Sequence, residues 1–82
     1  MKKDVKLQIR KDLNNNQQQN IIKLKGSLIS RGYTEIIHIT DQDDDFHLNF
    51  FETSPEFKNE VQEFIQTFIK KENLEDTVQF FK

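Results

Sequence analysis

The sequence predicts a single small α+β domain whose elements run strand, helix, strand, strand, helix, strand. Segments 5–10 and 46–52 alternate apolar and polar side chains, which is typical of half-buried strands. Segment 57–69 repeats apolar side chains at helical spacing. Because the chain has 82 residues and no cysteine, we expect residues 1–82 to form one domain that packing stabilises without disulfides.

The first half of the chain predicts one strand and one helix. In VKLQIR, residues 5–10, the odd positions are apolar and would face a core, whereas the even positions are polar. Residues 14–16 are all asparagine, which caps helices by accepting a backbone N–H, and the apolar residues of 21–29 follow at helical spacing. Gly26 costs this helix about 1 kcal/mol relative to alanine. Gly32 is a natural end for it.

The second half begins with a predicted hairpin. Segment 34–40 is rich in β-branched residues, and the acidic loop 41–45 joins it to the alternating segment 46–52. On the second strand of this hairpin, the side chains expected to face the helices are Phe46, Leu48 and Phe50, and those expected to face away are His47, Asn49 and Phe51. This assignment decides which aromatic side chains remain free on the surface.

A helix and a short strand complete the predicted fold. Ser54 is a preferred helix cap and Pro55 suits a first helical position, so the helix is expected to begin here. Asn73 is a plausible left-handed residue for its end. Segment 77–81, with Val78 and Phe80 inward, predicts the last strand.

The order of elements resembles the ferredoxin-like superfold, a βαββαβ split βαβ sandwich. Right-handed crossovers would place the first and third strands at the centre and the second and fourth at the edges. Two helices would then cover one face of a four-stranded antiparallel sheet and leave the other face open. The resemblance implies an architecture and no function, since this fold hosts many functions.

Composition excludes some classes of function and favours others. A net charge of −2 with 32% charged residues makes the chain slightly acidic, which argues against non-specific nucleic-acid binding. No segment approaches the roughly 20 apolar residues of a membrane span, and MKKDVKLQIR lacks the apolar run of a signal peptide. We therefore expect a cytoplasmic protein. Eight phenylalanines and no alanine suggest the coding bias of a low-GC bacterium or a phage. A computationally designed protein without biological function is an alternative, which the lack of alanine disfavours.

The acidic loop has the spacing of a calcium loop without its glycine. Asp41, Asp43, Asp45 and Glu52 occupy positions 1, 3, 5 and 12 of such a loop. Position 6, where the sharp turn needs glycine, is Phe46. We expect a solvated hairpin loop here, with weak divalent-ion binding left open.

Other combinations of chemically active residues are incomplete. His38 and His47 are expected to be cross-strand neighbours on the open face, where a zinc ion would need a further ligand. Nucleophilic catalysis needs a serine beside a base, but Ser27, Ser30 and Ser54 are each explained by a structural role, on the helix surface or as a cap. No glycine-rich phosphate loop follows a strand. The sequence therefore predicts no enzyme, no cofactor, no small-molecule ligand and no metal site.

The open sheet face is the predicted place of function. We expect a non-enzymatic protein-interaction or regulatory domain that binds a protein partner, or a second copy, through this face or an edge strand. The candidate protein-binding residues are Ile36, His38, His47, Phe51 and Phe81. The alternative is single-stranded nucleic-acid binding on the same face, through Lys6, Arg10 and Phe51, although the first strand carries no aromatic residue.

Overall fold

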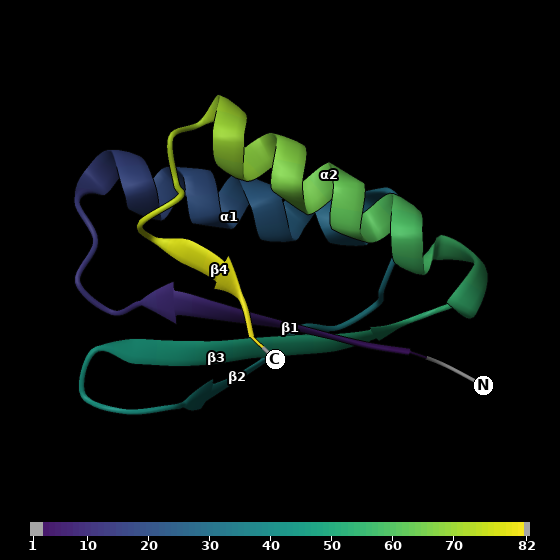
Figure 1. Ribbon diagram of the computed structural model, residues 1–82, viewed down its shortest axis with the longest axis horizontal. Coiled ribbons are helices and arrows are strands. Elements are labelled where there is room, and N and C mark those ends of the chain that lie inside the picture. Colours follow the sequence, from purple (N-terminus) through teal and green to yellow (C-terminus); the bar gives the residue numbers. More distant parts are fainter. Residues whose placement is uncertain (1–2, 82) are drawn as a thin grey trace.

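The computed structural model describes residues 3–81 and contains four strands and two helices in the order βαββαβ (Figure 1). The elements are β1 (Lys3–Arg10), α1 (Asn15–Ser30), β2 (His38–Asp41), β3 (Phe46–Thr53), a short 3-10 turn η1 (Pro55–Phe57), α2 (Lys58–Lys71) and β4 (Val78–Phe80). Met1, Lys2 and Lys82, which the predicted domain 1–82 includes, lie outside the described residues.

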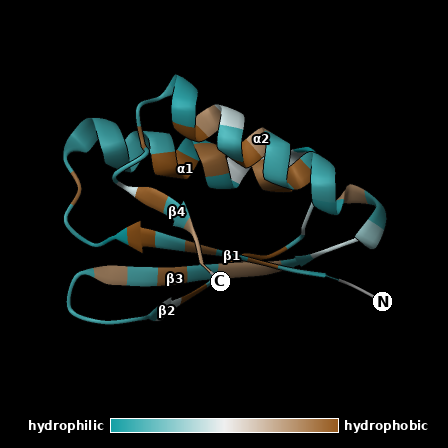
Figure 2. Ribbon diagram, viewed as in Figure 1, coloured by the Kyte–Doolittle hydropathy of each residue, from teal (hydrophilic) through white to brown (hydrophobic). Residues whose placement is uncertain are grey.

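The four strands form one antiparallel sheet in the order β2-β3-β1-β4. β1 and β3 therefore lie at the centre, and β2 and β4 at the edges. Both helices lie on the same side of the sheet (Figure 1), and their hydrophobic residues gather on the side toward it (Figure 2). The predicted α+β class, with two helices and a four-stranded antiparallel sheet, is confirmed.

Helix α1 begins with a reciprocal cap built from the Asn/Gln tract. The Asn14 side chain accepts the backbone N–H of Gln17 at 2.8 Å, and the Gln17 side chain accepts that of Asn14 at 3.0 Å. Gln17 Nε2 also donates to Thr77 Oγ1 at 3.2 Å, so the start of α1 is tied to the residue before β4. The predicted asparagine cap is confirmed, and Gly32 ends the helix region with a φ of 80°.

The second helix begins later than predicted. Pro55 opens η1, and the regular helix starts only at Lys58. Ser54 has the extended backbone of a capping residue, but its side chain makes no capping hydrogen bond; its backbone oxygen accepts the N–H of Phe57 at 2.9 Å instead. The predicted left-handed Asn73 is confirmed by its φ of 56°.

The core lies between the helices and the sheet. The odd residues of β1 face the helices as predicted. The buried apolar side chains are Val5, Leu7, Ile9, Ile21, Leu24, Leu28, Tyr33, Phe51, Val61, Ile65, Ile69, Leu74 and Val78. The stripe predicted over 57–69 divides into three groups. Its β-branched residues are buried, two of its phenylalanines pack at the margin of the core, and Phe57 is exposed.

The predicted orientation of β3 is wrong. Val5 of β1 lies opposite Phe51, Leu7 opposite Asn49, and Ile9 opposite His47. Residues paired in an antiparallel ladder share a face, so the odd residues of β3 face the helices and Phe51 is only 1% exposed. A one-residue change of phase moves every side chain of a strand to the other face. Phe50 and Phe51 are adjacent, so both phases of β3 carry a large apolar residue and alternation alone does not choose between them.

Strand β2 is also shorter and later than predicted. Thr34 to Ile37 precede it without strand pairing, because the Thr34 hydroxyl donates to the backbone oxygen of Ile36 at 3.0 Å and closes a local turn. Ile36 therefore lies on the loop that enters β2 and not in the sheet.

Candidate functional site

The open face of the sheet carries an apolar stripe along a central strand. Phe46, Leu48 and Phe50 of β3 point to this face and are half-buried although neither helix covers them. Their ladder partners on β1 are Arg10, Gln8 and Lys6. We call these six residues, together with His38 and Phe81, the open-face site.

Neighbouring side chains on the same face cover part of the stripe. The His38 ring stacks on Phe50 with centroids 5.0 Å apart and planes inclined by 22°. Gln42, just after β2, donates from Nε2 to Gln8 Oε1 at 3.0 Å, so this bond crosses β3. The Gln42 side-chain oxygen is buried and has no hydrogen-bond partner within residues 3–81. The stripe is thus bordered by polar groups that are not all satisfied.

Two predicted protein-binding residues lie on this face. His38 is there through its pairing with Phe50. The backbone N–H of Phe81 donates to the backbone oxygen of Lys6 at 3.0 Å. Phe80 pairs with Leu7, whose side chain faces the core, so the next residue, Phe81, faces the open side of the sheet. There its side chain is 38% exposed.

The structure corrects three other assignments. Phe51 is buried in the core, so neither a protein nor a nucleic acid reaches it. His47 lies on the helix side of the sheet, opposite Ile9. Ile36 is 60% exposed but lies on the loop before β2. Sequence reasoning missed Phe46, Leu48 and Phe50 because it gave β3 the wrong phase.

The predicted histidine neighbours do not meet. His38 stacks on the open face, whereas His47 lies on the opposite side of the sheet. There Asp41 Oδ1 is 3.3 Å from His47 Nδ1 and 3.4 Å from Lys11 Nζ. His47 Nδ1 is close enough for an ion pair but does not have hydrogen-bond geometry to the carboxylate. This cluster joins the end of β1 to the start of the hairpin loop.

The carboxylates of the acidic loop hold the turn and do not converge on a point. Asp43 Oδ1 accepts the backbone N–H groups of Asp45 and Phe46, each at 2.9 Å. Among residues 3–81, no group of three His, Cys, Asp or Glu side chains is placed to hold a metal ion. The calcium-loop spacing therefore does not produce a calcium-loop geometry.

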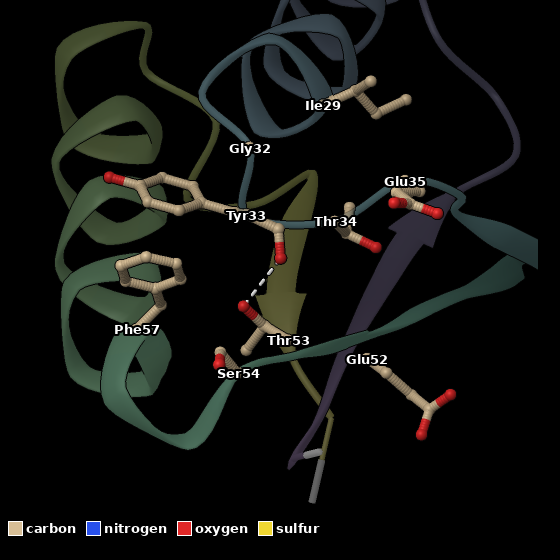
Figure 3. Close-up of a pocket in the computed structure, with 9 residues that line it drawn as sticks. All are labelled: Ile29, Gly32, Tyr33, Thr34, Glu35, Glu52, Thr53, Ser54 and Phe57. Atoms are coloured by element: carbon tan, nitrogen blue, oxygen red, sulfur yellow. Dashed lines mark hydrogen bonds between the residues drawn. The ribbon is translucent and has the colours of Figure 1, made fainter. Parts of the chain in front are cut away.

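A pocket of about 470 Å³ lies where the end of α1 meets the end of β3 (Figure 3). It is lined by Ile29, Gly32, Tyr33, Thr34, Glu35, Glu52, Thr53, Ser54 and Phe57. Sequence reasoning missed it because two chain segments that are far apart in the sequence, 29–35 and 52–57, supply its walls. The Thr53 hydroxyl donates to the backbone oxygen of Tyr33 at 2.7 Å, and the Tyr33 and Phe57 rings lie 5.9 Å apart.

The hydroxyl groups of Tyr33, Thr34 and Thr53 around this pocket already have structural partners. Tyr33 points its hydroxyl away from the pocket (Figure 3) and donates to Glu60 Oε2 at 2.6 Å. This hydrogen bond to a carboxylate raises the pKa of Tyr33 above 10.0, so the hydroxyl stays protonated at neutral pH. A protonated tyrosine held by a carboxylate is not a base aimed at a ligand.

No protein-family model, curated protein or solved structure matches the chain. In the part of the chain that the structure describes, no helix has the length and apolar character that crossing a membrane requires.

Proposed function

We propose that this chain is a non-enzymatic interaction domain that binds a protein partner through the open-face site. The observation that carries the proposal is the row of Phe46, Leu48 and Phe50 along a central strand with no covering layer. Covering the area that these side chains still expose would contribute on the order of 1 kcal/mol each.

The surroundings of the row support a protein as the occupant. Protein interfaces combine an apolar centre, in which aromatic residues and arginine are enriched, with a polar rim. Here the apolar centre is flanked by Arg10 and Lys6 on one side and by His38 on the other. The opposed pair Asp4 and Glu52 adds negative charge at one end of the face. This mixed rim favours a partner with both signs of charge.

A peptide library displayed on phage tests this proposal directly. Peptides selected on the whole chain should bind the Phe46→Ser/Phe50→Ser variant at least about tenfold more weakly. They should also shift the amide resonances of β1 and β3 at the open-face residues. The matched control is Phe57→Ser, which removes a phenylalanine that is 36% exposed away from this face. Peptides that bind the double variant as well as the unchanged chain would contradict the proposal.

A second candidate is single-stranded nucleic acid on the same face. The observation that favours it is the register of cations and rings, because Lys6 lies opposite Phe50 and Arg10 opposite Phe46. Bases stack on aromatic rings while neighbouring cations contact phosphates. With two phosphates neutralised, binding of labelled oligo(dT) or oligo(U) should weaken with a log–log salt slope of about −1.4. Affinity independent of salt, or unchanged in Lys6→Gln/Arg10→Gln, would exclude this candidate.

We further propose that the arrangement is ferredoxin-like and that the protein is cytoplasmic. The βαββαβ order and the central positions of β1 and β3 support the ferredoxin-like arrangement, which also requires right-handed crossovers between the strands. An experimental structure with a left-handed crossover would refute it. The absence of cysteine supports the second. Fractionation that places the protein in a membrane or outside the cell would refute that.

A further inference from the structure

Four exposed isoleucines belong to α1, to β2 or to the loop that joins them. Ile22 and Ile29 of α1 are 70% and 45% exposed, Ile39 of β2 is 53% exposed, and Ile36 lies just before β2. α1 lies behind α2 in Figure 1. α2 shares a surface hollow with β4 at the opposite edge of the sheet. We call this group of four residues the isoleucine flank.

The outward side of α1 is uncharged and contains an unexplained glycine. Gly26 lies four residues after Ile22 and three before Ile29, so the three share one side of the helix. A Cβ at Gly26 would meet no atom within 4 Å, and its φ is not positive. The monomer therefore gives no reason for a residue that weakens a helix. Close approach of a second backbone does give one.

Strand β2 presents a free edge. The Gln42 N–H donates to the Phe46 oxygen at 3.0 Å, and ladder groups alternate in direction along a strand. The N–H and C=O groups of His38 and Thr40 therefore point toward β3, and those of Ile39 point outward. β2 contains no lysine or proline, two residues that commonly block pairing at a sheet edge, and its charged residue, Asp41, lies at its end.

We propose that a second copy of this chain pairs antiparallel along β2, with the two Ile39 residues opposite each other about a two-fold axis. An axis perpendicular to the sheet keeps both pairs of helices on the same side. The outward groups of the two Ile39 residues then exchange two hydrogen bonds. The two α1 helices meet antiparallel above the extended sheet, with Gly26 allowing their backbones to approach. This surface is separate from the open-face site, and the inference does not depend on the proposed function.

Charge is compatible with a second copy as the occupant. α1 carries no acidic side chain, so two copies of it do not bring carboxylates together. The carboxylate in β2, Asp41, lies 3.4 Å from Lys11 Nζ of its own molecule, which partly offsets its charge. Antiparallel helices also place opposite dipole ends beside each other.

The size of the molecule sets an upper limit on the interface. The molecule measures 35 × 26 × 19 Å, and α1 lies on the far side of the view in Figure 1, which is taken down the shortest axis. The two longer dimensions enclose a rectangle of about 900 Å², and a standard interface takes about 800 Å² from each partner, so α1 and β2 must both contribute to the contact.

Sedimentation equilibrium of the whole chain tests the inference. We expect a mass near twice 9.9 kDa at about 0.1 mM protein. Gly26→Arg should weaken the dimer at least about tenfold while its thermal midpoint at dilute, monomeric concentration rises, because arginine is the better helix former. The matched control is Thr67→Arg, which places the same side chain on the exposed side of α2 and should leave the dimer intact.

Two further measurements locate the interface. The amide of Ile39 should show hydrogen-exchange protection that increases with protein concentration, and Ile39→Lys should abolish it. Phe50→Ser, on the open face, should not change the mass. A monomer at about 0.5 mM, a dimer unaffected by Gly26→Arg, or a dimer dissociated by Phe50→Ser would each overturn the inference.

Discussion

Phe51 of β3 lies directly opposite Val5 of β1 on the helix side of the sheet, and both side chains are almost completely buried. Its neighbour Phe50 points the other way and stacks on His38. Two adjacent phenylalanines thus have different roles, one in the core and one at the open-face site.

The first prediction follows from this difference. Phe51→Ala should destabilise the fold by about 3–5 kcal/mol, because it leaves a cavity in the core, whereas Phe50→Ala should cost about 1 kcal/mol or less. Urea unfolding monitored by circular dichroism measures both. A loss for Phe50→Ala that equals or exceeds that for Phe51→Ala would contradict the phase of β3 described here.

The adjacency of these residues also explains where sequence reasoning succeeded and where it failed. β1 has apolar residues only at odd positions, so its phase could be predicted. β3 has Phe46, Leu48 and Phe50 in one phase and Phe51 in the other. The series of three apolar residues was therefore expected to face the helices, whereas it faces the open side of the sheet. The core selects Phe51 because Thr53, two residues on, is fixed on the same side by its hydrogen bond to Tyr33.

Other features depend on contacts that no local pattern contains. The asparagine cap of α1 and the left-handed Asn73 are local, and their residue types made them predictable. The pocket beside Thr53 and the isoleucine flank combine segments far apart in the chain. Exposure of Ile22 and Ile39 depends on where α1 crosses the sheet, which the amphipathic pattern of α1 alone does not fix.

A second prediction concerns the cap of α1. Asn14→Ala removes the acceptor of the Gln17 N–H and should cost about 1 kcal/mol of unfolding free energy. Asn16→Ala changes the same residue type in the first turn and should be neutral or slightly stabilising, because alanine is the better helix former. Chemical denaturation of both variants gives the comparison. If Asn16→Ala is the more damaging change, the cap does not form as described.

A third prediction concerns the acidic loop. Asp43→Ala leaves two backbone N–H groups without their acceptor and should cost about 1–2 kcal/mol. Hydrogen exchange at Asp45 and Phe46 should become faster. Asp44→Ala is the control, since Asp44 is exposed and its neighbour Asp43 holds the turn. Similar effects of the two substitutions would show that the loop is held by its charge and not by the Asp43 hydrogen bonds.

The hydrogen bond from Tyr33 to Glu60 predicts how stability depends on alkaline pH. The hydrogen bond to Glu60 raises the pKa of Tyr33 in the folded state above its ordinary 10.0. The stability that this bond contributes is therefore fully present below pH 10.0 and is lost as pH rises through the raised pKa. Tyr33 is the one tyrosine in a chain without tryptophan, so absorbance of tyrosinate at about 295 nm reports on it alone.

Two variants separate this effect from the titration of other groups. Glu60→Gln removes the negative acceptor and should return the Tyr33 pKa toward 10.0. In Tyr33→Phe, the loss of stability between about pH 10 and pH 11 should be smaller than in the unchanged chain, because the titrating group is gone. An absorbance titration with its midpoint at or below 10.0 in the unchanged folded chain would show that the bond to Glu60 does not form in solution.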